Sequence, residues 1–403
     1  MFPFFGLGAA LQARGHRVTV VVSEHYRPLA IEHGFDFAAL VPTAETERLL
    51  ANPDFWHPIK SMRIASQWGL PWIGEQYETL SRLANSPDTA LIASPGVVAA
   101  RVLQEKRGVP LASVLLQPWM VPSSIAPPIM PARLTLPRWA PPPAKWLYFR
   151  GFDAVGDWLV GRKINELRAA IGLPPMRRIF RWWLSPQLVI GMFPAWYGRP
   201  QRDWPAQLRL TGFPLYDGRP AAELCPDLVA FCQAGPPAVA FTFGTGMMHS
   251  AKLFRAAVDC CSRLAIRGLL LTKYRSQLPA ELPPKVRQVE YAPFQQLFPR
   301  CAAVVHHGGI GTTATAFAAG VPQLVVPLAF DQVDNAVRVK RLGGGDWIKA
   351  NRASGARLAT ALAPLLTAAA RNRSSAMAEK MSEHGSGFAL AAQLAEQMLP
   401  AAR

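Results

Sequence analysis

The sequence lacks most features that mark secreted, membrane-spanning or metal-binding proteins. Its 403 residues include five cysteines, none of them in a CxxC pair. An odd number of cysteines without such spacing argues against a disulfide framework and indicates a reduced, cytoplasmic protein. No apolar run reaches the roughly 18 residues needed to span a bilayer, and the first dozen residues lack the basic start of a signal peptide. No metal-ligand motif is present, so we expect neither a metal nor another cofactor.

Acidic residues are scarce compared with basic ones: 26 Asp and Glu stand against 43 Lys and Arg, for a formal net charge of +17. Such a balance fits nucleic-acid binding, an anionic membrane surface or acidic lipid, or a surface that mainly serves solubility. Nucleic acid is disfavoured because no lysine-rich tract occurs, and the other two interpretations stay open. The densest basic region, residues 162–209, brings Arg181 next to Trp182 and Trp183. Arginine beside tryptophan is typical of a membrane interface and equally of an exposed helix end, so association with the inner face of a membrane is one expectation.

The length and the apolar fraction of 50% predict two domains, each with its own core. Both halves alternate strand and helix patterns, which predicts parallel sheets covered on both faces. The predicted strands are residues 17–22, 35–40, 89–93, 111–116, 188–192 and 208–211 in the first half, and 238–243, 268–272, 286–290, 302–305 and 323–326 in the second. A stretch rich in glycine and proline predicts a linker at 218–236 between domains 1–217 and 237–385, and a terminal helix is expected within 386–403.

The most informative segment is a glycine-rich turn between a predicted strand and a predicted helix. Backbone N–H groups and the helix dipole at such a turn suit a phosphate, and imidazole and hydroxyl groups can add hydrogen bonds. We therefore predict a diphosphate site. Its residues are His306, His307, Gly308, Gly309, Gly311, Thr312 and Thr313.

A second polar group follows the next predicted strand. Asp331, Gln332 and Asn335 place a carboxylate beside two amides. Such a set accepts and donates hydrogen bonds in fixed directions, which suits the hydroxyl groups of a sugar. Together with the turn, it predicts a site for a nucleotide sugar.

These residues resemble the donor signature of the nucleotide-sugar glycosyltransferases with the GT-B fold. The resemblance implies an α/β protein, in which two Rossmann-like, doubly wound domains face each other across a cleft. It implies a base-binding role for Tyr291, Ala292 and Pro293. A glycine-rich lip with Gly244 and Thr245 is similar to the family's second diphosphate contact.

Residues 178–218 are similar to the chain-B rhamnosyltransferases of rhamnolipid synthesis, above all in 193–196 and 211–214. The resemblance implies an inverting glycosyltransferase that moves a sugar from a dTDP- or UDP-sugar to a hydroxyl of a hydrophobic, hydroxyalkanoyloxy-alkanoate-like acceptor. In this family, loops of the first domain line the acceptor pocket. The proline-rich segment 117–145 cannot be regular helix or central strand, and we expect it to shape that pocket with the following aromatic residues. Those residues fit an ordinary core as well: Trp146, Tyr148, Phe149, Phe152 and Trp158.

The start of the chain departs from the family pattern. The family's first strand ends in Gly-Asp-x-x-Pro or Gly-His-x-x-Pro, and here only Pro3 and the later Arg14-Gly15-His16 match. The Asp or His that acts as base would precede Met1, so we expect the first strand of the N-terminal domain to be missing and the start to be truncated or mis-assigned. The nearest histidines are His16 and His25, and His16 is expected in a turn rather than in catalysis.

Two other functions fit the same architecture. A nucleotide-sugar 2-epimerase would use the same donor site, but that class tends to lack a proline- and aromatic-rich acceptor loop. An inactive donor-binding fragment would keep the donor signature and lack the base, as this sequence does.

Overall fold

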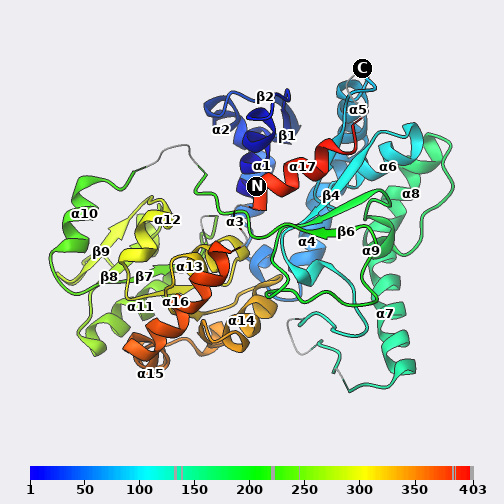
Figure 1. Ribbon diagram of the computed structural model, residues 1–403. Helices are drawn as coiled ribbons and strands as arrows, with labels where there is room; N and C mark the ends of the chain where they lie inside the picture. Colours follow the sequence, from blue (N-terminus) through cyan, green and yellow to red (C-terminus); the bar gives the residue numbers. More distant parts are fainter. Residues whose placement is uncertain are drawn as a thin grey trace.

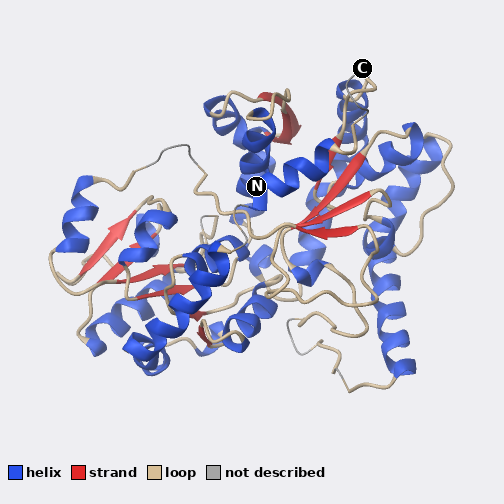
Figure 2. Ribbon diagram, in the orientation of Figure 1, coloured by secondary structure: helices blue, strands red, loops and turns tan. Residues whose placement is uncertain are grey.

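The computed structural model describes residues 1–130, 134–137, 139–218, 223–244, 246–383, 385 and 387–399. Two α/β halves lie side by side, and each has a parallel sheet with helices around it (Figures 1 and 2). Among the described residues, no helix is long and apolar enough to cross a bilayer.

The C-terminal half contains a six-stranded sheet of order β12-β11-β10-β7-β8-β9, and its neighbouring strands pair in parallel. Side chains alternate between two cores: Val239 and Phe241 lie in one cluster with α11 and α15, whereas Ala240 lies in the other with α10 and α12. The predicted strands are confirmed, and an edge strand was not predicted. The strands are β7 (Val239–Thr242), β8 (Gly268–Leu271), β9 (Val286–Val289), β10 (Ala303–His306), β11 (Gln323–Val325) and the unpredicted β12 (Gly345–Trp347).

The sheet of the N-terminal half is divided into two. One part pairs β1 (Thr19–Ser23) with β2 (Asp36–Val41), and the other has the order β3-β4-β5-β6. A doubly wound sheet places its first strand between the second and the fourth, so the division falls where the missing strand is expected. The remaining strands are β3 (Leu91–Ala93), β4 (Leu111–Leu115), β5 (Leu188–Gly191) and β6 (Leu208–Leu210).

The strands beside the division are less buried than their neighbours. All three residues of β3 and two of the three valines of β1 are only half-buried, whereas β4 and β5 are buried throughout. A strand at the centre of a doubly wound sheet is normally covered on both faces. β1 and β3 therefore have the burial of edge strands.

Helices cover both halves, and their bounds match the predicted alternation. The predicted linker 218–236 contains a helix, α10, whose Leu228 is buried against the C-terminal sheet. The helices are α1 (Phe2–Gln12), α2 (Arg27–Glu32), α3 (Thr43–Ala51), α4 (Ser61–Gly69), α5 (Ile73–Leu83), α6 (Val98–Arg107), α7 (Pro142–Gly156), α8 (Arg162–Ala170), α9 (Ile179–Trp182), α10 (Pro226–Gln233), α11 (Ala251–Leu264), α12 (Phe294–Leu297), α13 (Ile310–Ala318), α14 (Gln332–Arg341), α15 (Gly355–Leu362), α16 (Ala368–Ser382) and α17 (Gly387–Glu396).

The last helix, α17, returns to the N-terminal half and packs against α1 (Figure 1). Its Phe388 lies in one buried cluster with Leu7 of α1 and Val114 of β4. Arg14 and His16, in the turn after α1, both bond to Glu396. The two ends of the described chain thus hold each other in place.

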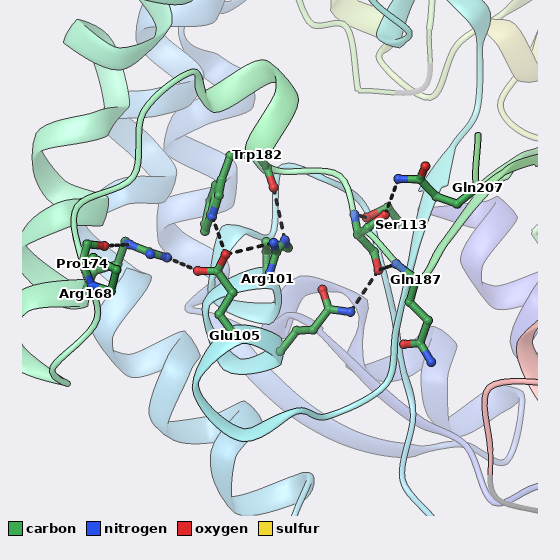
Figure 3. A network of polar contacts seen from close by, with 10 residues as sticks. Arg101, Glu105, Ser113, Arg168, Pro174, Trp182, Gln187 and Gln207 are labelled. Atoms are coloured by element: carbon green, nitrogen blue, oxygen red, sulfur yellow. Dashed lines mark hydrogen bonds and ion pairs between the residues drawn. The ribbon is translucent and has the colours of Figure 1, made fainter. Parts of the chain in front are cut away.

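Trp182 is part of an internal polar network rather than a free surface (Figure 3). Its indole N–H donates to Oε1 of Glu105 at 2.9 Å, and the same carboxylate pairs with Arg101 and Arg168. Arg101 also donates to the Trp182 carbonyl at 3.2 Å. The arginines that contact this tryptophan are Arg101 and Arg168, and these contacts fasten α9 to α6 and α8 and leave the indole N–H unavailable to a membrane.

The segment 178–218 joins the two halves. Trp196 and Tyr197 form edge contacts with Phe317 of α13, at centroid distances of 5.7 and 6.2 Å. Tyr197 is fully buried in a cluster that also holds Phe213 and Val339 of α14. The tertiary structure thus gives this segment an interface role that its sequence did not reveal.

Candidate functional site

The glycine-rich turn starts at the carboxyl end of β10, where His306 is fully buried. Its Nδ1 accepts the Gly308 N–H at 3.1 Å, so Nε2 carries the proton and donates to Oε1 of Gln323 at 3.0 Å. Burial lowers the pKa of His306 to about 3, and the ring is neutral at physiological pH. Both ring nitrogens are hydrogen-bonded within the protein, so the predicted diphosphate contact of His306 is corrected to a structural role.

His307 lies between the turn and the lip after β7. A Cβ built on Gly309 would come within 2.6 Å of its Nε2, and one on Gly244 within 3.4 Å. Burial lowers the pKa of His307 to about 4, and its Nδ1 is buried without a hydrogen-bond partner among the described residues. A neutral imidazole with an unsatisfied nitrogen at this place is suited to a ligand oxygen, and the predicted diphosphate contact stays a prediction.

The helix start behind the turn is open. Gly309 is the N-cap of α13, and the first N–H groups of a helix have no partner within it. Gly311 is exposed, and a Cβ there would meet nothing within 4 Å. Thr312 is half-buried beside it. These groups can face an anion, which agrees with the predicted cradle.

Thr313 lies underneath the cradle rather than in it. Its side chain is fully buried, and its hydroxyl donates to the Gly309 carbonyl at 3.0 Å. The predicted diphosphate contact of Thr313 is therefore corrected: the residue stabilises the first turn of α13.

Gly308 has to be glycine for two reasons. Its φ is +92°, and a Cβ would lie 2.8 Å from Cγ1 of Val325 and 3.0 Å from the carbonyl oxygen of Gln332. The close approach brings the turn against the start of α14, which carries the predicted sugar-binding residues.

Asp331 and Gln332 begin α14 and have different surroundings. Asp331 is half-buried, and burial raises the pKa of its carboxyl to about 6. Gln332 is 4% exposed, and its Oε1 accepts the N–H groups of Leu328 and Ala329 at 2.7 and 2.9 Å. The Asp331 carboxylate is thus available to a sugar hydroxyl, whereas only the amide nitrogen of Gln332 lacks a bond among the described groups.

Asn335 is a buried junction and not an open sugar contact. Its Nδ2 donates to the Gly308 carbonyl at 2.9 Å and to Oδ2 of Asp331 at 2.6 Å. Its Oδ1 accepts the hydroxyl proton of Tyr197 at 2.7 Å. The predicted sugar contact of Asn335 is corrected: the residue positions the turn and Asp331, and connects both to the N-terminal half.

The same helix binds the proline-rich loop. Oδ1 of Asp334 accepts the Ile129 N–H at 3.0 Å, and Oδ2 pairs with Arg338 at 2.5 Å. Arg338 also donates to the Tyr197 carbonyl at 2.8 Å. Sequence reasoning missed Asp334, Arg338 and Tyr197. Asp334 and Arg338 could have been found from the sequence, because they lie three and seven residues after Asp331 on the same helix. No sequence pattern singles out Tyr197.

The lip is covered by the N-terminal half. Thr245, a predicted diphosphate contact, lies outside the described residues. A Cβ on Gly246 would meet Leu50 at 3.2 Å and Trp56 at 3.9 Å. Beside them, Phe55 packs on Phe330 at a centroid distance of 5.3 Å. The end of α3 and the 3₁₀ segment after it therefore close over the donor side.

The predicted base-binding segment is held by the chain that connects the halves. The hydroxyl of Tyr291 donates to the Asp217 carbonyl at 3.1 Å, and the Asp217 carboxylate accepts the N–H of Phe294. Ala292 is buried and Pro293 is the N-cap of α12, whereas Tyr291 is 48% exposed. A half-open ring can pack on a base, and this role stays a prediction.

A cavity of about 1000 Å³ lies along α14. Its described walls are residues 118–129 and 135–137 of the proline-rich loop, the loop 196–204, and the helix face that includes Asp334 and Val337. Asp334 follows Asp331 by about one helical turn, and no residue of the turn 306–313 lines the cavity. Its lining is mostly apolar, and Arg199 and Arg202 add positive charge.

The aromatic residues after the proline-rich loop line no part of that cavity. Trp146 and Trp158 of the α7 region are exposed, whereas Phe152 stacks on Phe180 at 4.6 Å. Of the proline-rich loop and the aromatic residues after it, only the loop lines the cavity. One face of α7 packs on the protein, and the other faces solvent.

The two histidines near the start of the chain lie at opposite ends of β1. His16 precedes the strand and bonds to Glu396 at 2.8 Å, away from the carboxyl edge. His25 follows β1 directly, in the 3₁₀ turn Glu24–Tyr26. The expectation that His16 is not catalytic agrees with its position.

The chain matches known glycosyltransferases. The family model described as the C-terminal domain of erythromycin biosynthesis protein CIII-like proteins matches residues 269–396. The chain is 30% identical over 359 residues to an O-mycaminosyltylonolide 6-deoxyallosyltransferase from Streptomyces fradiae, covering 85% of this chain and 81% of that one. The chain is also 30% identical to a vancomycin aglycone glucosyltransferase from Amycolatopsis orientalis, and the match covers 76% of that protein. A sterol 3-beta-glucosyltransferase from Leptosphaeria maculans is 26% identical, and the chain spans 24% of its length.

Solved structures agree on the fold. The glycotransferase of kitacinnamycin superposes with a TM-score of 0.72 at 23% identity, covering 99% of this chain and 96% of that one. A spinosyn rhamnosyltransferase complexed with thymidine diphosphate gives 0.68 at 19% identity, with 98% and 96% covered.

Proposed function

This chain belongs to the nucleotide-sugar glycosyltransferases of the GT-B fold, and we propose that it transfers a sugar from a dTDP- or UDP-sugar to a hydroxyl of a lipid acceptor. The single observation that carries the proposal is that Asn335 connects the turn at the open start of α13 to the Asp331 carboxylate. A diphosphate and a sugar need these two groups side by side.

The donor diphosphate would lie on the first turn of α13, next to His307. As the bond between the anomeric carbon and the diphosphate oxygen breaks, negative charge builds on the leaving group. The helix N-terminus and the free N–H groups stabilise that charge without any rearrangement. We propose that the transfer needs no metal, and that the Asp331 carboxylate accepts a hydrogen bond from a sugar hydroxyl.

The cavity along α14 favours a hydrophobic, acidic acceptor of the hydroxyalkanoyloxy-alkanoate type. Its proline-rich wall offers apolar contacts, and Arg199 and Arg202 are suited to a carboxylate. We propose rhamnose as the sugar, because the similarity of residues 178–218 to rhamnosyltransferases extends over the segment that forms the wall with Arg199. A lipid acceptor implies work at the inner face of a membrane.

We propose that the base comes from a parallel strand between β1 and β3. Parallel strands end at the same edge of a sheet, and this edge faces the donor turn across the cleft in the GT-B arrangement. The acceptor oxygen would attack the anomeric carbon from the face opposite the diphosphate, with inversion, while the base takes its proton. The division of the sheet supports the proposal.

The test is an assay with dTDP-rhamnose and UDP-glucose, each with a 3-(3-hydroxyalkanoyloxy)alkanoic acid. The chain is assayed as printed and with the in-frame codons upstream of Met1. The mass of the product identifies the sugar. Product from the longer chain alone supports the proposed base, and an epimerised nucleotide sugar without transfer would contradict the proposed reaction.

The divided sheet favours a second candidate for the 403 residues themselves, which is donor binding without transfer. Calorimetry with dTDP and UDP separates the two. Tight binding without product from either chain supports this candidate, whereas the absence of binding rejects both.

A further inference from the structure

Helix α7 and the π-helical turn that continues it, Asp157–Gly161, present several large apolar side chains to solvent. Trp146, Leu147, Val155 and Trp158 are 62%, 66%, 55% and 77% exposed, and Trp139 before the helix is 84% exposed. Figure 1 shows α7 at the periphery of the N-terminal half. The outward face of a surface helix is normally polar, and a contiguous apolar patch marks an interaction site.

The opposite face of the helix packs on the protein, so the exposed residues are not its core face. Phe152 stacks between Tyr148 and Phe180. Gly156 makes room for Phe180, because a Cβ there would lie 2.4 Å from Cε2 of that ring. The Asp157 carboxylate accepts the N–H groups of Arg178 and Ile179 at 2.8 and 2.9 Å. The apolar face is therefore held rigidly outward.

The charges around this face are positive. Asp153 is buried, and Asp157 is occupied by backbone groups, so neither carboxylate of this segment is presented outward. Arg150 lies over the Trp146 ring at 5.2 Å. An exposed cluster of arginines flanks the helix on the side of α9, namely Arg177, Arg178 and Arg181. Glu166 of the following helix α8 is paired with Arg162 and Lys163.

We propose that α7 docks on an anionic membrane, with its apolar face in the headgroup layer. Tryptophan favours the interface between water and acyl chains, and an amphipathic helix lies in that plane with its apolar side down. Flanking arginines and the net charge of +17 complement anionic lipid. Trp146 and Trp158 replace Trp182 as the contacts, since Trp182 is bonded inside the protein.

This docking surface is connected to the acceptor cavity. The Tyr148 hydroxyl of α7 donates to the Leu134 carbonyl at 3.0 Å, and Thr135 and Leu136 line the cavity. An acceptor taken from the bilayer would therefore enter close to where α7 touches it. This connection rests on the proposed function, whereas membrane docking does not.

The test is sedimentation of the full chain with vesicles of phosphatidylglycerol and phosphatidylcholine, compared with phosphatidylcholine alone. The double variant Trp146→Gln/Trp158→Gln is compared with Ile31→Gln, which changes an equally exposed apolar residue on α2. Burying one large apolar side chain corresponds to roughly a tenfold change in an equilibrium constant. We expect the double variant to lose at least about tenfold in binding to anionic vesicles, and Ile31→Gln to match wild type.

Further measurements locate the contact and separate the alternatives. Acyl chains brominated near the headgroup should quench wild-type tryptophan fluorescence, and Arg178→Gln/Arg181→Gln should weaken binding at low salt only. Equal binding by wild type and the tryptophan variant would overturn the proposal. So would a dimer that only the tryptophan variant disrupts, without vesicle binding, because the face would then join two copies. Calorimetry with dTDP on the same variants shows that the donor site is intact, so loss of docking and failure of the proposed function remain distinguishable.

Discussion

The two sheets of this protein differ in continuity, because the C-terminal sheet is continuous and the N-terminal sheet is divided between β1 and β3. In the C-terminal sheet, β7, β8, β10 and β11 are buried throughout, and the turn after β10 is braced by His306 and Asn335. In the N-terminal half, the sheet is divided and β3 is half-buried. A site that binds a ligand through preorganised backbone groups needs a continuous, buried sheet beneath it. The sheet edge at which a base is expected lies in the divided sheet.

The largest effect is expected where the braced turn is broken. Gly308→Ala should lower the free energy of unfolding by about 3 kcal/mol, because the new Cβ meets Val325 and a carbonyl at a positive φ. It should also abolish dTDP binding, measured by calorimetry. Gly311→Ala is the matched control, since its Cβ meets nothing, and it should unfold like wild type.

The same substitution in the two sheets sharpens the comparison. Val304→Ala in β10 removes fully buried methyl groups and should cost about 2 kcal/mol in urea unfolding. Val21→Ala in β1 should cost less than about 1 kcal/mol, because Val21 is half-buried beside the division. Equal costs would show that the division leaves β1 as well packed as β10.

The link between the halves is tested by removing one hydroxyl. Tyr197→Phe leaves Oδ1 of Asn335 buried without its donor, which should cost about 1–2 kcal/mol of stability. Because Asn335 also holds Gly308 and Asp331, dTDP-sugar affinity should fall as well. Tyr274→Phe, at a tyrosine outside the junction, should change neither. A loss of stability without a loss of dTDP-sugar affinity would show that Tyr197 contributes to packing and not to the donor site.

The smallest effect concerns pH. The carboxyl pKa of Asp331 is raised from 3.8 to about 6 by burial, so the folded protein keeps this proton between about pH 4 and 6. Ionisation through that window lowers the free energy of unfolding, because the folded state binds this proton more tightly, and it makes the carboxylate available to the sugar. Donor affinity should therefore rise as the pH increases from 5 to 7, and Asp331→Asn should flatten this profile. A wild-type profile without a midpoint near 6 would contradict the role.

The sequence predicted the strands well because buried parallel strands are continuous apolar runs, such as Val304-Val305 before the turn. The shape of the turn could be predicted, because a strand, a run of glycines and a helix in succession fold into a strand–turn–helix unit. The roles of single residues within the turn could not be predicted. His306 and His307 are adjacent and chemically identical, and only the position of Gln323 decides that the first is a brace. Asn335 has the chemistry of a sugar contact, but Tyr197, 138 residues away in the chain, occupies its oxygen.

The aromatic helix was misjudged for a related reason. The aromatic residues of this segment fit a pocket wall and an ordinary core equally well. Phe180 packs on Phe152 of one face, and nothing among the described residues covers Trp158 on the other.

The sequence by itself determined the fold class, the alternation of strand and helix, and the glycine-rich turn between β10 and α13. These features depend on local geometry and on periodicity, which neighbouring residues carry. The tertiary structure alone decided which polar groups are satisfied internally and which apolar surface stays exposed. Both depend on partners distant in the chain, since a hydrogen bond or a packing contact exists only once two such segments meet.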